Sequence, residues 1–186
     1  MSAKKIIVKE NPDVILLTNY NSIKGRKMLE SFQEKNIKIE KIIAIKTGVS
    51  YNIKLFGFVS KRIGFIEATI FSFYKIACDC IHEIFFCDLE SLNNLASKNK
   101  IPIVVIKDDG NWQKIASETI DDSNAKIIVM GQLGILGKDF DLKRNDRLFL
   151  NCHPGKLPEY RGLDSFKWAI LNKDWENLSC TIHIAR

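Results

Sequence analysis

Short apolar runs alternate with amphipathic segments along most of the chain. Uninterrupted apolar runs are typical of strands buried on both faces of a parallel sheet. They predict strands at residues 13–18, 42–45, 84–87, 103–106, 127–130, 148–151 and 181–184. Between the runs, apolar positions at helical spacing predict helices around residues 28–32, 89–96, 112–116 and 166–170. This alternation predicts an α/β fold, with a Rossmann-like, mostly parallel sheet flanked by helices.

Polar residues before two predicted helices offer N-caps. The turn at residues 19–22 precedes the first helix, and Asp164 or Ser165 precedes the last.

The segment from Tyr51 to Cys78 has the longest helical apolar pattern. Its stripe consists of Phe56, Val59, Ile63, Ile66, Ile70, Phe73 and Ala77. We interpret the segment as a long helix or a helix pair that packs on the sheet or on a second subunit, because apolar stripes usually face a core. Charged residues interrupt it, so we do not expect a membrane span. Because the stripe could pack on a second subunit, a homo-oligomer is possible.

The composition is that of a globular protein. The chain has 186 residues, of which 46% are hydrophobic and 27% charged. This length suits one domain with a substantial core, so we expect a single domain over residues 1–186. The formal net charge is +6, but the lysines are spread along the chain. The modest positive field favours anionic ligands, and without a block of like charge a nucleic-acid partner is not expected.

Cysteine usage predicts a cytoplasmic protein. The five cysteines are an odd number at irregular spacing, which does not suggest a disulfide framework. The run Cys78-x-Cys80-x-His82 lacks the two-residue gap of zinc knuckles, so we expect no metal site. No signal-peptide h-region follows the first residues.

Two polar side chains stand together at the end of the predicted strand 148–151. Asn151 and His153 share one face of an extended chain, while Cys152 points to the other. Histidine is suited to proton exchange near pH 7, and an Asn amide can donate to a developing oxyanion. Taken alone, the pair also fits a capped strand end with a hydrogen-bonded His.

A longer string of residues carries a family resemblance. It resembles the active-site segment of the folate-dependent formyltransferases, which include enzymes for methionyl-tRNA, glycinamide ribonucleotide and amino sugars. The string reads Asn151-Cys152-His153-Pro154-Gly155-Lys156-Leu157-Pro158-Glu159-Tyr160-Arg161-Gly162, with Trp168-Ala169-Ile170 and Thr181-Ile182-His183 after it. The convincing match covers roughly residues 127–184. The resemblance implies the formyltransferase fold, 10-formyltetrahydrofolate as cosubstrate, and Asn151 and His153 as catalytic residues.

The loop after the strand 127–130 looks like the family's pterin-binding loop. The resemblance assigns it the folate-binding residues Gly131, Gln132, Leu133, Gly134, Ile135 and Leu136. Small residues suit a flat aromatic ligand that lies against backbone. The glycine spacing is not the G-x-G-x-x-G dinucleotide fingerprint. An ordinary strand-to-helix turn is the alternative.

Four further residues are candidates for substrate binding. Tyr160, Arg161 and Gly162 either face the acceptor or lock the loop, and Arg161 is as compatible with a structural clamp as with a substrate contact. His183 either edges the site or is a half-buried structural His.

The sequence departs from the family's pattern in two places. The family has a third catalytic residue, an Asp shortly after the Thr-Ile-His strand, and this sequence ends at Arg186. We therefore expect either a truncated enzyme or a noncatalytic binding or regulatory relative. The turn at 19–22 also lacks the glycines with which glycinamide ribonucleotide enzymes bind phosphate. The acceptor we expect is a small-molecule amine, first of all a nucleotide-linked amino sugar; a methionyl-tRNA formyltransferase-like enzyme is the alternative.

A cysteine hydrolase is the remaining alternative. Cys152 and His153 are adjacent in a strand and point to opposite faces, so they cannot form a direct nucleophile–base pair.

Overall fold

The computed structural model describes residues 13–47, 56–57, 60–61, 64–70, 72–73, 91–108, 110–131, 133, 136, 140, 142, 146–161 and 165–185. The strands are β1 (Val14–Asn19), β2 (Ile39–Thr47), β3 (Ile103–Asp108), β4 (Ile127–Gly131), β5 (Leu148–His153) and β6 (Thr181–Ile184). The α-helices are α1 (Ile23–Glu34), α4 (Leu92–Lys98), α5 (Trp112–Asp121) and α6 (Ser165–Leu171), and η1 (Trp175–Asn177) is a 3-10 helix.

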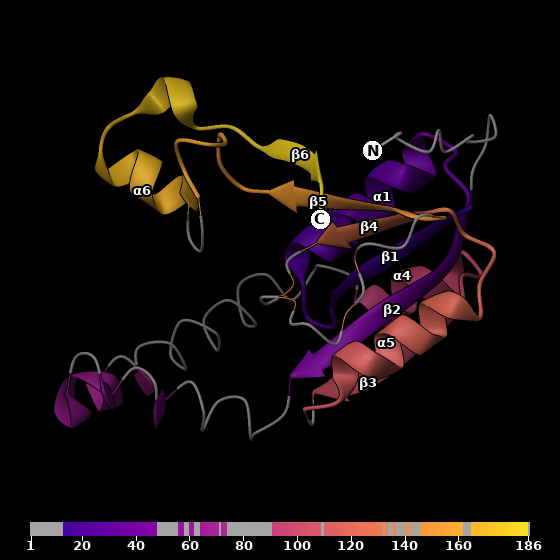
Figure 1. Ribbon diagram of the computed structural model, residues 1–186, viewed down its shortest axis with the longest axis horizontal. Helices are drawn as coiled ribbons and strands as arrows, with labels where there is room; N and C mark the ends of the chain where they lie inside the picture. Colours follow the sequence, from indigo (N-terminus) through magenta and orange to yellow (C-terminus); the bar gives the residue numbers. More distant parts are fainter. Residues whose placement is uncertain are drawn as a thin grey trace.

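The strands form one six-stranded sheet in the order β3-β2-β1-β4-β5-β6 (Figure 1). All neighbouring strands are parallel except β5 and β6, which are antiparallel. The chain moves from β1 outward to β3 and then returns to the other side of β1 with β4. Ligands of open α/β sheets bind beyond the carboxyl ends of the strands where the order reverses in this way. In this sheet that point lies between β1 and β4.

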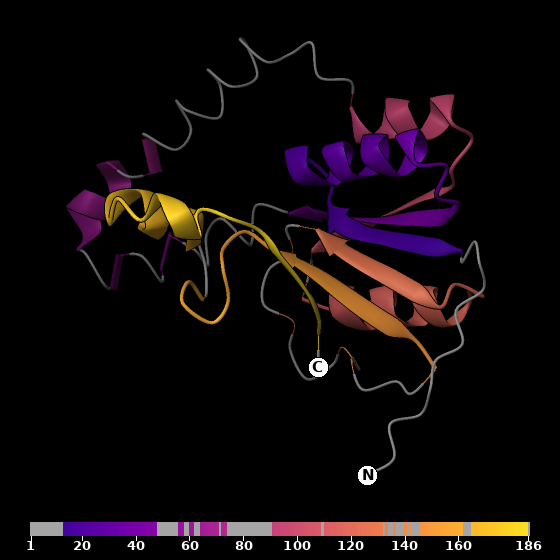
Figure 2. The ribbon, with the colours of Figure 1, turned by 90° about the horizontal axis from the view of Figure 1, so that it is seen from above.

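Helices cover both faces of the sheet. In Figure 2, α1 and α4 lie on one face and α5 lies on the other. The α1-side core contains Leu16, Leu29, Ile42 and Leu95 among its buried residues. The α5-side core contains Ile15, Leu17, Ile43, Trp112, Ile120, Ile128, Met130 and Phe149 among others. Successive residues of β1 enter opposite cores, which explains why its sequence is an uninterrupted apolar run.

Close packing holds α1 against the carboxyl ends of β1 and β4. Thr18 is fully buried, and its hydroxyl donates to the backbone oxygen of Gly131 at 2.7 Å. A Cβ on Gly25 would lie 2.5 Å from Thr18 Oγ1, and one on Gly131 would lie 2.7 Å from Met28 Sδ. A side chain at position 25 would clash with the buried Thr18, whereas one at position 131 would displace the end of the Met28 side chain. The start of α1 is thus packed closely beside the sheet edge where a ligand is expected.

Most predicted elements are confirmed. Strands and helices occur at the predicted places, apart from the predicted strand 84–87 and the start of the helix 89–96, which lie outside the described residues. Ser22 caps α1, since its hydroxyl accepts from Gly25 N at 2.8 Å. One detail was wrong: Ser165 is the first residue of α6, so it is not its cap.

The apolar segment 51–78 is described only in part. The described residues at 56–57, 60–61, 65–70 and 72–73 are helical, as the spacing predicted. Ile66, Ile70 and Phe73 are 64–70% exposed, so these three residues do not pack on the sheet, which was the first of the two expected partners of the stripe. Packing against a second subunit stays a prediction. None of the helices among the described residues is long and apolar enough to cross a membrane.

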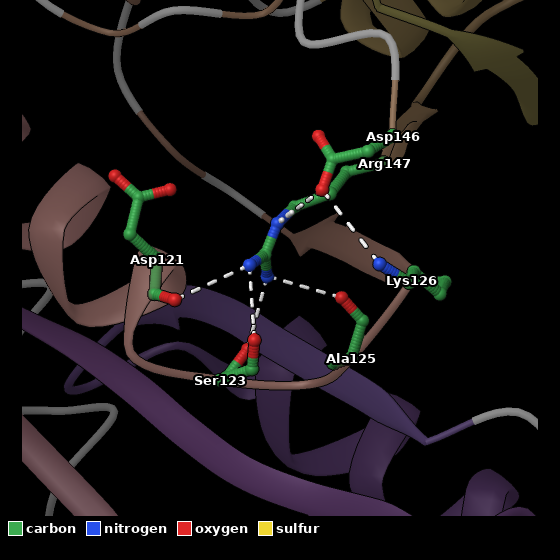
Figure 3. A network of polar contacts seen from close by, with 6 residues as sticks. All are labelled: Asp121, Ser123, Ala125, Lys126, Asp146 and Arg147. Atoms are coloured by element: carbon green, nitrogen blue, oxygen red, sulfur yellow. Dashed lines mark hydrogen bonds and ion pairs between the residues drawn. The ribbon is translucent and has the colours of Figure 1, made fainter.

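A buried arginine closes the loop between α5 and β4 (Figure 3). Arg147 directly precedes β5 and is 9% exposed. Its Nη1 donates to Ser123 Oγ at 3.0 Å and to Ala125 O at 3.1 Å, and its Nη2 donates to Ser123 O at 2.9 Å and to Asp121 O at 3.4 Å. The guanidinium fork thus satisfies the carbonyls at the end of α5 and ties them to β5.

We predict that Arg147→Ala destabilises the protein by about 3 kcal/mol, because it leaves buried carbonyl groups without donors. Urea unfolding followed by circular dichroism measures the change. Asp146→Asn is the matched control, because Asp146 contacts Arg147 at 3.6 Å but is 60% exposed; it should cost less than about 0.5 kcal/mol. Equal losses in the two variants would contradict the assignment of stability to the buried fork.

Candidate active site at the carboxyl end of β5

The candidate catalytic side chains stand where β5 runs past β4. Asn151 lies opposite Met130, the last paired residue of β4 in this ladder, and His153 lies opposite Thr181 of β6. Phe149, earlier in β5, is buried in the α5-side core. Because alternate residues of a strand share a face, Asn151 and His153 leave β5 on the same side as Phe149.

The Asn151 amide contacts His183 on the neighbouring strand. The two residues are register partners, and Asn151 Nδ2 donates to His183 Nε2 at 3.1 Å. His183 Nδ1 lies 3.2 Å from the backbone oxygen of Ile184. A carbonyl oxygen only accepts, so Nδ1 of His183 carries the ring proton and Nε2 is the acceptor. This bond uses one hydrogen of the amide, and the second can donate to an oxyanion.

His153 is held by the loop that follows it. Its Nε2 lies 2.8 Å from the backbone oxygen of Tyr160 and 2.9 Å from the hydroxyl of Ser165. The first contact requires a proton on Nε2. In neutral His153, Nδ1 is therefore the nitrogen with a lone pair.

The loop packs tightly around Ser165. Gly155 is buried, and a Cβ there would lie 2.7 Å from Ser165 Cβ and 3.1 Å from the Tyr160 oxygen. Thr181 anchors the other side of the loop, because its hydroxyl donates to Gly155 O at 2.7 Å and accepts from Leu157 N at 3.2 Å. The absence of a side chain at Gly155 thus allows the loop to bring Tyr160 and Ser165 to His153.

Two of the predicted substrate residues make contacts within the protein. The Tyr160 hydroxyl donates to Asp174 Oδ2 at 2.8 Å, and Asn177 Nδ2 donates to the same oxygen at 2.8 Å. The hydrogen bonds from Asn177 and Tyr160 hold the pKa of Asp174 below its usual value. Arg161 is exposed, and its Nε donates to Pro158 O at 3.1 Å, next to a cis Leu157–Pro158 peptide bond. A role in acceptor binding stays a prediction for both.

The predicted folate loop follows β4 and is described in part. Gly131 ends β4, and Leu133 and Leu136 are partly buried against the α5-side core. That core lies on the face from which Asn151 and His153 leave β5, so the two predicted groups share one side of the sheet. Gln132, Gly134 and Ile135 lie outside the described residues, as does Gly162 of the acceptor group.

Cys152 lacks the environment of a nucleophile. Its side chain is half-buried, and desolvation and the nearby Cys180 raise the pKa of its thiol, against a smaller opposite effect of Lys24. A reactive cysteine requires a lowered pKa, so the cysteine-hydrolase alternative loses support.

No three His, Cys, Asp or Glu side chains among the described residues are arranged to hold a metal ion. Cys78, Cys80 and His82 lie outside the described part of the chain.

The sequence did not reveal three of the contacts that hold the site. Ser165 was interpreted as a helix cap, and Asp174 had no assigned role. A serine before an apolar helix pattern has the same appearance whether it caps the helix or contacts a neighbouring loop, so no signal separates the two roles. The pairing of His183 with Asn151 depends on the direction of β6, which residue patterns do not encode.

These features define an open α/β protein with its polar site at the carboxyl edge, beside the point where the strand order reverses. More narrowly, the fold is that of the formyltransferases. The phosphoribosylglycinamide formyltransferase of Anaplasma phagocytophilum is similar to it with a TM-score of 0.57 and 15% sequence identity. The match covers 95% of this chain and 65% of that one.

Other solved structures give the same result. The phosphoribosylglycinamide formyltransferase of Coxiella burnetii matches with a TM-score of 0.55 and 17% identity, over 95% of this chain and 66% of that one. The formyltetrahydrofolate deformylase of Pseudomonas putida KT2440 matches with a TM-score of 0.50 and 11% identity, over 95% of this chain and 55% of that one. No protein-family model matches the sequence, and no curated protein matches it either. The predicted fold class is confirmed.

We predict that Cys152 is alkylated several times more slowly than Cys180 by iodoacetamide near neutral pH. Cys180 is exposed, whereas the raised pKa of Cys152 leaves less of its thiol as the reactive thiolate. Peptide-resolved mass spectrometry of a time course measures both rates in one sample. Faster alkylation of Cys152 would show an activated thiol and would restore the hydrolase alternative.

Proposed function

We propose that this protein belongs to the folate-dependent formyltransferases and transfers a formyl group from 10-formyltetrahydrofolate to a primary amine. The observation that carries the proposal is the placement of Asn151 and His153 on one side of the sheet, with Leu133 and Leu136 on that same side. The fold and the motif residues 151–161 support it together. The third catalytic Asp implied by the resemblance has no counterpart among the described residues, so catalytic competence is part of the proposal.

The residues fit the folate that the family resemblance implies. Leu133 and Leu136, which follow β4, offer apolar surface for a flat ring on the side of the sheet from which Asn151 and His153 project. Bound 10-formyltetrahydrofolate would supply an activated formyl group on N10. Asn151 would donate its second amide hydrogen to the oxyanion, and His153 would accept a proton from the attacking amine.

The acceptor we propose is a nucleotide-linked amino sugar. The turn after β1 supports this choice over glycinamide ribonucleotide, because it contains no glycine and the Ser22 hydroxyl already satisfies the Gly25 amide that a phosphate would need. Lys24 in the first turn of α1 and Lys46 in β2 add positive charge at the same edge of the sheet. Such charge favours the diphosphate of a sugar nucleotide.

Location and assembly complete the proposal. We place the protein in the cytoplasm, since Cys152 and Cys180 are free thiols, as in reducing compartments. A homo-oligomer is proposed on the exposed apolar residues Ile66, Ile70 and Phe73.

We predict that the full gene product binds a stable analogue of 10-formyltetrahydrofolate in a calorimetric titration. Asn151→Ala and His153→Ala should each lower the rate of formyl transfer about 100-fold or more, with folate binding largely kept. Asn124→Ala changes an exposed Asn in the loop between α5 and β4 and should have no effect. Absence of folate binding would refute the proposed function, and binding without transfer would favour the noncatalytic alternative.

We predict that an assay panel identifies a nucleotide-linked amino sugar as the acceptor. The panel includes glycinamide ribonucleotide, methionyl-tRNA and a reaction without amine, in which release of formate reports hydrolysis. Lys24→Ala should raise the KM for the sugar nucleotide about 3- to 10-fold, less at high salt, because a charge contact is lost. Lys35→Ala, at the opposite end of α1, is the matched control. Transfer to another amine would refute this acceptor while retaining the reaction.

A further inference from the structure

Ser165 contacts the candidate catalytic His153 from within the protein. It is fully buried at the start of α6, and its Oγ lies 2.9 Å from His153 Nε2. The Tyr160 backbone oxygen lies 2.8 Å from the same nitrogen. Two oxygens therefore flank one ring nitrogen: the hydroxyl of Ser165, to which the sequence assigned no role in folate or acceptor binding, and the backbone oxygen of Tyr160.

The carbonyl decides where the ring proton is. A carbonyl oxygen cannot donate, so a hydrogen bond to Tyr160 O exists only when Nε2 carries a proton. Ser165 then accepts a share of the same N–H, as in other three-centre bonds. A neutral imidazole has one N–H, which leaves Nδ1 with its lone pair. Among the described residues, none hydrogen-bonds to Nδ1 of His153.

We propose that Ser165 is a positioning residue: the Tyr160 carbonyl sets the Nε2–H form of His153, and the Ser165 hydroxyl holds the ring in place so that Nδ1 accepts the proton of the attacking amine. The inference rests on the proposed function. In the transfer, the amine nitrogen bonds to the formyl carbon, and the bond between that carbon and folate N10 breaks. The proton lost by the amine passes to Nδ1 of His153 and then to N10 of the leaving folate.

The same contacts stabilise the ring once it is protonated. When Nδ1 gains a proton, the ring becomes a cation and both contacts of Nε2 become charge-assisted hydrogen bonds, which are stronger than neutral ones. His153 is half-buried, so solvation by water compensates the charge only in part. Ser165 thus stabilises the protonated ring at the moment when His153 holds the proton of the amine.

The alternative role for Ser165 is packing alone. Its Cβ lies 2.7 Å from the place where a Cβ on Gly155 would be, so the residue also fills space under the loop. Ser165→Ala separates the two roles, because it keeps the Cβ and removes only the hydroxyl. A packing role predicts an unchanged kcat in Ser165→Ala.

His183 provides an internal reference for the measurement. Its Nδ1 contacts the Ile184 carbonyl and its Nε2 accepts from Asn151, so it should be the opposite, Nδ1–H form. The chain has only three histidines, and their ring nitrogens can be assigned individually. The His153→Gln variant identifies the His153 signals by their loss.

Long-range ¹H–¹⁵N correlation spectra of the full gene product, recorded at a pH where the rings are neutral, test the proposal. We expect the Nε2–H form for His153 in the unchanged protein and in Ser165→Ala, because the Tyr160 carbonyl remains in both, and the Nδ1–H form for His183. The same variant should lower kcat about 10-fold and change KM less than about 2-fold. Ser117→Ala, which changes a buried serine on α5, should leave the tautomer and kcat unchanged.

Two results would overturn the inference, and both are separable from the proposed function. One is an Nδ1–H form of His153 in the unchanged protein, and the other is an unchanged kcat in Ser165→Ala. Either result with normal folate binding refutes the role of Ser165 alone. Spectra that agree with the expectation, in a protein that does not bind folate, would refute the proposed function instead.

Discussion

The backbone pairing of β5 with β6 is the interaction on which the candidate site depends. The β4 ladder ends opposite Asn151, so β6 is the strand that continues to hold β5 as far as His153. The same strand supplies His183 to the Asn151 amide and Thr181 to the loop after His153. One ladder of backbone hydrogen bonds therefore fixes both candidate catalytic side chains and the loop around them. A site built on paired strands keeps its geometry better than one built on free loops.

Residue patterns predicted the elements well because burial imposes them. The run at the start of β1 is apolar at successive positions because its residues enter both cores, and the spacing of Asn151 and His153 sets their common face. The patterns could not predict what depends on contacts through space. Three features depend on how segments that are distant in sequence pack together, which the local sequence pattern does not determine. They are the direction of β6, the contact of Ser165 with His153, and the exposure of Ile66 and Ile70.

The likeness to solved formyltransferases shows how weakly a fold constrains individual residues. Identities of 11–17% accompany a match over 95% of this chain. A parallel sheet needs apolar residues of suitable size in its strands, and many sequences meet that need. Chemistry is more selective, because it requires particular atoms at particular places. For this reason the fold and the proposed reaction are supported by different observations. The sheet supports the fold, and a few side chains at the edge of the sheet support the reaction.

Strand β5 joins two fixed points. Arg147 anchors its amino end to the loop after α5, and β6 holds its carboxyl end at His153. The distance between these points is therefore set by the number of residues in the strand, at about 3.3 Å for each. Insertion or deletion of one residue would turn Asn151 toward the opposite side of the sheet. We therefore expect homologues of this protein to differ in the lengths of their loops. The number of residues between the positions of Arg147 and His153 should stay constant.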